Sequence, residues 1–195
     1  MPRLNNQSPI SWEDAAIRAA YEQYGVEGFY QRFGNTYRNP HERVVRAALK
    51  AAVARWELPL DHVLDLACGS GEVTLALREL GSAAIDGIDP YTHQAYADRT
   101  GQVAEQITFE QVAAGALAGR SYSTIVCSFA LHLVALSRLP ALMTQLSLIG
   151  TTLLILTPHK RPLLRPEWGW RCADELQIER VRARYYRPTY ALDKD

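Results

Sequence analysis

The segment from Val63 to Leu80 constrains the fold of this chain more than any other. Val63–Leu66 reads as a short buried strand that ends in the turn Gly69-Ser70-Gly71, and a helix is predicted directly after it. Glycine allows a backbone to turn sharply and to approach a ligand closely. A buried strand that enters a helix through such a turn indicates a parallel sheet, and sheets of this kind bind ligands at the carboxyl ends of their strands.

Strands and helices alternate along the rest of the chain. Apolar runs predict strands over 83–88, 124–128 and 151–156 and a weak one over 103–107. Periodic segments predict helices over 92–100 and 136–149. The stretch 172–186 is expected to be extended. We expect three of its arginines on a solvated edge strand, where charge prevents pairing between sheets; they are Arg180, Arg182 and Arg184.

Two helices are predicted ahead of this alternation. The first opens at Ser11, which has capping-box-like spacing, and is broken by Gly25 and Gly28. The second begins with Asn39 as N-cap and Pro40 in the first turn, and its apolar spacing buries one face as far as Trp56. We expect these helices to form a cap beside the sheet.

The whole pattern predicts an α/β protein with a doubly wound, mostly parallel sheet. A chain of 195 residues fits one domain, with 1–58 as the helical cap and 59–195 as the core. Lys+Arg and Asp+Glu number 21 each, which argues against nucleic-acid binding through bulk charge. No apolar run approaches a membrane span and no apolar signal core precedes Ser11, so we expect a cytoplasmic protein without membrane attachment. The cysteines form no C-x-x-C pair, which disfavours a zinc site or a disulfide scaffold.

Two carboxylates indicate the kind of ligand. Asp89 ends the second strand, where a carboxylate can accept hydrogen bonds from both hydroxyls of a ribose. Asp65 lies inside the first strand, where it would repel a pyrophosphate but suits a ligand with an ammonium group. Thr74 stands where a dinucleotide site has its third glycine. These residues favour a cationic nucleoside over a nicotinamide cofactor.

The pattern D-x-x-x-G-x-G from Asp65 to Gly71, with Ile88-Asp-Pro90 and Ser128-Phe-Ala-Leu-His132 after it, resembles the class I S-adenosylmethionine-dependent methyltransferases. The resemblance covers about 63–157. It implies a Rossmann-like, seven-stranded-type sheet in the order 3-2-1-4-5-7-6, with the last strand antiparallel. Because no turn signal splits 172–186, we expect a shortened C-terminal hairpin in which one strand is missing or fused.

The same resemblance implies S-adenosylmethionine as cofactor and S-adenosylhomocysteine as product. Gly69 and Gly71 would lie under its methionine part, with Asp65 and the Ala67 carbonyl near the ammonium group. Asp89 would hold the ribose. The other cofactor-binding residues implied are Pro90 and Tyr91 beside the adenine, Phe109 and Glu110 on its ring and amino group, and Ser128 after the fourth strand.

The loops between Gln111 and Pro166 predict the character of the site that binds the methyl acceptor. No Asp or Glu occurs from Gln111 to Pro166, so the loops there supply no oxygen ligands for a hard cation and no metal is expected. His132 and His159 follow strand ends and are candidate general bases. Tyr37, in an aromatic segment that could close over the cofactor, is the third catalytic candidate. Together with Lys160 and Arg161 these residues predict an apolar-aromatic pocket with a basic rim, suited to an anionic or neutral acceptor.

The sequence therefore predicts a metal-independent methyltransferase. A small-molecule acceptor is our first choice, because the chain has no insertion that could form a substrate domain. A protein or RNA acceptor is the first alternative. The second is a non-catalytic S-adenosylmethionine-binding module that works by holding a partner protein. The oligomeric state is left open.

Overall fold

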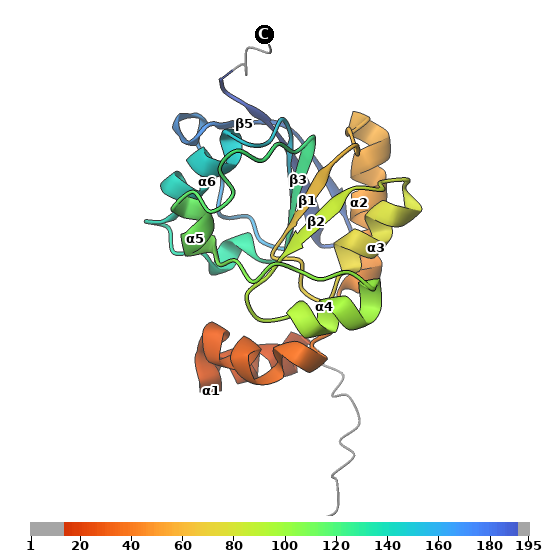
Figure 1. The fold of residues 1–195 in the computed structure, drawn as a ribbon, viewed down its shortest axis with the longest axis vertical. Coiled ribbons are helices and arrows are strands. Elements are labelled where there is room, and N and C mark those ends of the chain that lie inside the picture. Colours follow the sequence, from red (N-terminus) through yellow and green to blue (C-terminus); the bar gives the residue numbers. More distant parts are fainter. Residues whose placement is uncertain (1–13, 191–195) are drawn as a thin grey trace, which may run out of the picture.

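The computed structural model describes residues 14–190, which form a sheet with helices on both faces (Figure 1). The sheet has six strands in the order β2-β1-β3-β4-β6-β5. The first four run parallel, β6 is antiparallel to β4, and β5 is antiparallel to β6. This is the mostly parallel α/β architecture that the sequence predicts. The strand bounds are β1 Val63–Leu66, β2 Ile85–Ile88, β3 Thr124–Ser128, β4 Leu153–Thr157, β5 Trp170–Ile178 and β6 Val181–Pro188.

The helices form two layers with the sheet between them (Figure 1). One layer holds α2 (Glu42–Trp56) and α3 (Glu72–Glu79), and the other holds α5 (Phe109–Ala113) and α6 (Leu139–Ser147). Helix α1 lies apart from both layers, below the sheet in this view. The remaining elements are α1 Asp14–Phe33, α4 His93–Thr100 and the 3-10 turns η1 Gly34–Thr36, η2 Leu131–Leu133 and η3 Pro166–Trp168.

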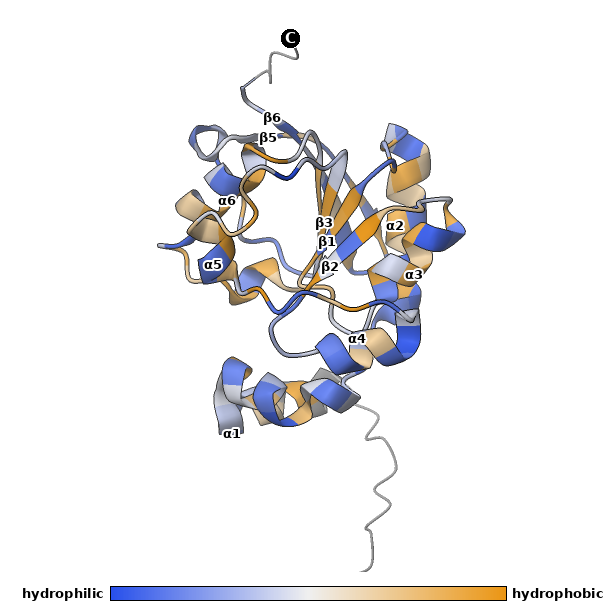
Figure 2. Ribbon diagram, viewed as in Figure 1, coloured by the Kyte–Doolittle hydropathy of each residue, from blue (hydrophilic) through white to orange (hydrophobic). Residues whose placement is uncertain are grey.

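The core lies on both faces of the sheet because successive side chains of a strand point to opposite faces. In β3, Ile125 and Cys127 pack into the cluster that contains α6, whereas Val126 packs with α2 and α3. Strands buried on both faces are mainly apolar, and β1 and β3 contain orange residues in Figure 2, although β1 also holds Asp65. Their apolar character is why they are predicted well from sequence.

Both ends of the sheet differ from the prediction. The weak strand predicted over 103–107 is reduced to one bridge between Ile88 and Glu105. At the other end, the prediction of a missing or fused strand is wrong: β5 and β6 form a complete antiparallel hairpin. Their turn contains Glu179 at φ 53°, a left-handed conformation usually signalled by glycine. This turn therefore has no sequence signal.

The N-terminal helices also differ in part. Helix α1 is broken at Gly25, which has φ 69° and ψ 166°, but it continues through Gly28. The predicted start at Ser11 lies outside the described residues. Asn39 does not cap α2, which begins at Glu42; its Oδ1 instead accepts a hydrogen bond from the His41 amide at 2.9 Å. Asn39 thus shapes the loop before the helix.

Candidate active site

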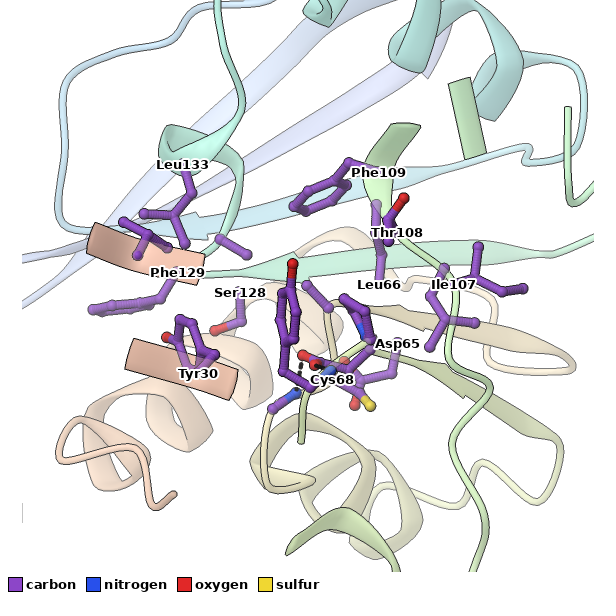
Figure 3. A pocket seen from close by; sticks show the side chains of 18 of the residues that line it. Tyr30, Asp65, Leu66, Cys68, Ile107, Thr108, Phe109, Ser128, Phe129 and Leu133 are labelled. Atoms are coloured by element: carbon purple, nitrogen blue, oxygen red, sulfur yellow. Dashed lines mark hydrogen bonds between the residues drawn. The ribbon is translucent and has the colours of Figure 1, made fainter. Parts of the chain in front are cut away.

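A cavity of about 590 Å³ lies at the carboxyl ends of the parallel strands. Its volume is in the range of small-molecule sites, roughly 300–1,000 Å³. In Figure 3, Tyr30, Phe129 and Leu133 lie on one side, Ile107 and Phe109 on the other. The lining thus joins α1, the turn after β1, the loop after β2, the start of α5 and the segment after β3. Residues far apart in the sequence meet here, as expected for parallel strands.

The turn after β1 forms the base of the cavity. Gly71 has φ 87°, and a Cβ there would lie 2.5 Å from Thr100 Cγ2, so α4 packs directly against the turn. Gly69 has φ 55°, and Ala67 takes φ 58° although it carries a side chain. A non-glycine residue with positive φ is uncommon, and such strain concentrates at functional sites.

Asp65 is held with one carboxylate oxygen bonded and the other without a partner. Its side chain is 1% exposed, and its Oδ2 accepts hydrogen bonds from the Thr74 amide (3.0 Å) and hydroxyl (2.7 Å). Among the described residues, no group bonds its Oδ1. Burial raises the pKa of Asp65 to about 7. A buried carboxylate with a free oxygen beside a cavity is a site for a cation.

Asp89 organises the loop after β2. Its Oδ1 accepts hydrogen bonds from the amides of Tyr91 (2.9 Å) and Thr92 (3.0 Å), and its Oδ2 accepts one from Gly69 (3.3 Å). Burial raises the pKa of Asp89, and these backbone donors oppose the rise. The carboxylate thus ties the β2 loop to the glycine turn at the wall of the cavity.

Glu72 is a lining residue that the sequence analysis missed. It is 4% exposed, and its Oε1 accepts hydrogen bonds from the Ser70 hydroxyl, the Asn39 amide (3.2 Å) and Arg99 (3.3 Å). Arg99 also bonds Glu42 at 2.8 Å, so one guanidinium connects α4 with α2 and α3. Burial raises the pKa of Glu72. Its place directly after Gly71 was the available signal.

Aromatic residues of the N-terminal segment close the cavity. The rings of Tyr30 and Tyr91 are nearly parallel, with centroids 6.3 Å apart, and Tyr30 packs edge-on against Tyr37 at 5.3 Å. The Tyr21 hydroxyl donates a hydrogen bond to the Tyr30 hydroxyl at 2.8 Å. A Cβ on Gly34 would lie 2.4 Å from the Tyr91 carbonyl oxygen, so η1 packs directly on the β2 loop. These contacts hold α1 across the mouth.

Most sequence-predicted site residues meet at this cavity. His132 and His159 do not line it; their rings pack against each other with centroids 4.4 Å apart at the ends of β3 and β4. Partial burial and the nearby His159 lower the pKa of His132 to about 4. Gly71 shapes the turn without lining the cavity. The predicted residues in the lining are Tyr37, Asp65, Ala67, Gly69, Asp89, Pro90, Tyr91, Phe109, Glu110 and Ser128.

The charge of the cavity differs from the basic rim predicted from sequence. Lys160 and Arg161 are not in the lining, and Arg138, its one basic residue, lies 3.7 Å from Glu110. The prediction considered only the loops after β3 and β4, whereas α1 and the start of α3 also reach the cavity. The acidic residues of the lining are Glu27, Asp65, Glu72, Asp89 and Glu110.

Residues 14–190 contain neither a group of metal ligands nor a membrane-spanning helix. No group of three or more His, Cys, Asp or Glu residues there could hold a metal ion. Within the same residues, no helix has the length and apolar character needed to span a membrane.

Comparison with known proteins adds independent findings. Residues 63–149 match the methyltransferase domain family. An uncharacterized protein of Schizosaccharomyces pombe is 32% identical over an alignment that covers 91% of this chain and 94% of that protein. Magnesium protoporphyrin IX methyltransferase from Synechocystis PCC 6803, solved with bound S-adenosylmethionine, has a TM-score of 0.57 at 16% identity and covers 93% of this chain and 100% of its own.

Ribosomal protein L11 methylase from Lactobacillus delbrueckii has a TM-score of 0.55 at 14% identity, over 79% of this chain and 81% of its own. Identities this low show a shared fold only. The domain match covers the segment from β1 to the residues after α6, which holds the glycine turn, Asp65 and Asp89. The chain belongs to the class I S-adenosylmethionine-dependent methyltransferases.

Proposed function

We propose that this protein transfers a methyl group from S-adenosylmethionine to a small-molecule acceptor in the cavity beneath α1. The observation that carries the proposal is the carboxylate of Asp65, which is buried and lines the cavity, and whose Oδ1 has no partner in the described part of the chain. The ammonium group of the cofactor is the kind of cation that such an oxygen can bind. Thr74 holds Asp65 in place and leaves no third glycine for a pyrophosphate.

The residues of the lining fit the parts of the cofactor. Asp65 and the Ala67 carbonyl would hold the ammonium group, and Asp89 the ribose. Ser128, whose hydroxyl also has no partner among the described residues, would contact the methionine end. The adenine would lie among Pro90, Tyr91, Phe109 and Glu110, which line one continuous region.

When bound, the cofactor supplies a methyl group already activated on a sulfonium. The chain then needs to align the acceptor and exclude water. Tyr30 and Tyr37 are placed for this task at the closed side of the cavity. Burial and the nearby Glu72 raise the pKa of Tyr37, so its hydroxyl stays protonated at neutral pH and acts as a hydrogen-bonding group rather than as a base. His132 and His159 stay predicted bases for an acceptor that must lose a proton.

The position of α1 over the cavity supports a small molecule as the methyl acceptor. Val26, Glu27 and Tyr30 of α1 belong to the lining, so α1 narrows the approach that a large protein or RNA surface would need.

Calorimetric titration tests the proposal. We expect S-adenosylhomocysteine to bind and NAD to bind more weakly or not at all, because Asp65 suits an ammonium group and would repel a pyrophosphate. Transfer of tritium from methyl-labelled S-adenosylmethionine to a small molecule would then establish the reaction. Tighter binding of NAD than of S-adenosylhomocysteine would overturn it.

A further inference from the structure

We infer that the methyl acceptor is an amine, because Glu27 and Glu72 add carboxylates to an aromatic-lined cavity beyond those that the cofactor uses. This inference rests on the proposed function and narrows it to one class of substrate. An amine is protonated at neutral pH, so it arrives as a cation that carboxylates and aromatic faces both attract.

The charges of the lining can be assigned one by one. Asp65 and Asp89 are used by the ammonium group and ribose of the cofactor, and Glu110 is assigned to the adenine and lies 3.7 Å from Arg138. Glu27 and Glu72 line the cavity and have no such assignment. Glu72 pairs with Arg99 through Oε1, so it offers Oε2 as a hydrogen-bond acceptor, and Glu27 supplies the charge without a basic partner in the described lining. A carboxylic acid or phosphate acceptor would meet these negative charges without a free cation in the described part of the lining.

Glu72 presents one oxygen to the cavity side of the glycine turn. Its three hydrogen-bond donors all bond Oε1. Its Oε2 lies 3.4 Å from the position that a Cβ on Gly69 would occupy, and the Tyr37 ring lies 3.6 Å from the same position. A carboxylate oxygen and an aromatic ring therefore approach one point at the base of the cavity.

Glu27 lies on α1, opposite the base. Its Oε1 accepts a hydrogen bond from Gln31 at 3.0 Å, which orients the side chain. It lies close enough to Tyr91 to raise the pKa of that hydroxyl, after burial as the larger cause. Glu27 thus carries negative charge at the mouth, where it would attract a cation and favour its entry.

Aromatic rings supply the second attraction. Tyr30, Tyr37 and Phe129 belong to the lining, and the first two are in edge-on contact. The faces of such rings carry negative electrostatic potential, which attracts ammonium groups. Carboxylates combined with aromatic faces lower the cost of removing an ammonium group from water.

In the transfer step, the ammonium form of the acceptor gives one proton to a carboxylate of the cavity, Glu27 or Glu72, in place of the predicted histidine bases, which do not line the cavity. The nitrogen lone pair is then free. That nitrogen forms a bond to the methyl carbon while the carbon–sulfur bond breaks and its electron pair stays on sulfur. The product is the N-methylated ammonium ion, and the carboxylic acid returns its proton to water.

A panel of paired acceptors tests the inference. The protein is incubated with tritiated S-adenosylmethionine and 2-phenylethylamine, tyramine or 1,4-diaminobutane, each beside the alcohol and carboxylic acid of the matching carbon skeleton. A short lysine-containing peptide is a separate arm, and S-adenosylhomocysteine binding is measured in parallel. We expect label in the free amines and none in the alcohols or acids.

Variants link the result to the lining. Glu27→Gln removes one charge without a change of shape, so we expect kcat/KM for amines to fall about fivefold, the effect of one charge about 4 Å away in water. Glu22→Gln, on the same helix but outside the lining, should leave it unchanged. Glu72→Gln is less informative alone, because Asn39 and Arg99 depend on that carboxylate.

The outcomes distinguish failure of the amine inference from failure of the proposed function. Three results would each overturn the amine inference alone. They are label in alcohols or acids, no label in any amine while S-adenosylhomocysteine binds, and an equal effect of Glu27→Gln and Glu22→Gln. Label in the peptide but in no free amine keeps the amine chemistry and overturns the small-molecule acceptor. Failure to bind S-adenosylhomocysteine overturns the proposed function itself.

Discussion

Asp65 combines two properties that rarely occur together, complete burial and an oxygen that no group within residues 14–190 bonds. Its pKa of about 7 in the folded protein lies above that of an exposed aspartate. The folded state therefore holds the proton more tightly than the unfolded state. The stability that follows is complete below about pH 4, and it is lost as pH rises through about 7.

This titration predicts how ligand binding depends on pH. An ammonium ligand needs the ionised carboxylate, so affinity for S-adenosylhomocysteine should rise up to about pH 7 and then level off. With a pKa of about 7, we expect binding about tenfold weaker at pH 6 than at pH 8. Calorimetry across this range measures it. Asp65→Asn, which cannot ionise, should bind more weakly and show a flat profile; an unchanged slope would assign the titration to another group, with Glu72 and Asp89 as the nearest.

The two kinds of site residue differ in how far sequence can predict them. Asp65, Gly69 and Asp89 follow strand ends at spacings that a parallel sheet requires, so their meeting at one cavity was predicted. Glu27 and Glu72 reach the same cavity only because α1 crosses its mouth and α3 begins beneath it. No spacing in the chain places Glu27 there, and the place of Glu72 directly after Gly71 was the one available signal. The predicted basic rim was wrong because the prediction did not include these acidic residues.

At the scale of elements, α1 offers a matched pair of glycines. Gly25 has φ 69° and ψ 166°, a combination that is essentially restricted to glycine, whereas Gly28 lies in the helix that follows the break. A Cβ on Gly28 would meet only Tyr24 Cβ, at 3.7 Å. The direction of the second half of α1, which carries Tyr30, thus depends on Gly25.

We therefore expect Gly25→Ala to destabilise the placement of α1 by about 1–3 kcal/mol and to weaken S-adenosylhomocysteine binding. Gly28→Ala should be neutral or stabilising by up to about 1 kcal/mol, since alanine is the better helix former. Hydrogen exchange over 14–41, with and without the ligand, compares the two. Equal protection in both variants would show that the break does not position α1.

At the scale of the whole molecule, the C-terminal hairpin has one strand inside the sheet, β6, and one exposed strand at its edge, β5. The sequence analysis placed Arg184 on an exposed stripe, but β6 lies between β4 and β5 and Arg184 is 2% exposed. It bonds Glu175 at 2.6 Å and donates hydrogen bonds to the carbonyl oxygens of His159 (3.3 Å) and Lys160 (3.0 Å). One side chain thus ties the hairpin to the loop after β4.

Arg184→Ala should lower the free energy of unfolding by about 1–3 kcal/mol, because it removes one of the two arginines that bond Glu175 and leaves carbonyl groups of the loop after β4 without that donor. Arg180→Ala, at the exposed turn, should change it by less than about 0.5 kcal/mol. Urea denaturation measures both. A small effect of Arg184→Ala would mean that water replaces the lost bonds.

The centre of the sheet was predictable and its borders were not. β3 and β1 have the predicted bounds, because strands covered on both faces are mainly apolar, and Asp65 is the charged exception in β1. The single bridge at Glu105 depends on hydrogen bonds to a neighbouring strand, and the hairpin turn depends on the unusual φ angle of Glu179. Local composition carries neither piece of information.

Arg99 limits how this protein could be improved by directed evolution. The same guanidinium connects α2, α3 and α4, and it bonds a carboxylate that lines the cavity. A substitution there alters the scaffold and the electrostatics of the cavity together, so tolerance to heat and choice of substrate cannot be selected separately at this position. Libraries that aim to change the acceptor while keeping the fold would leave Arg99 fixed and vary Glu27, Phe129 and Leu133 at the opposite wall.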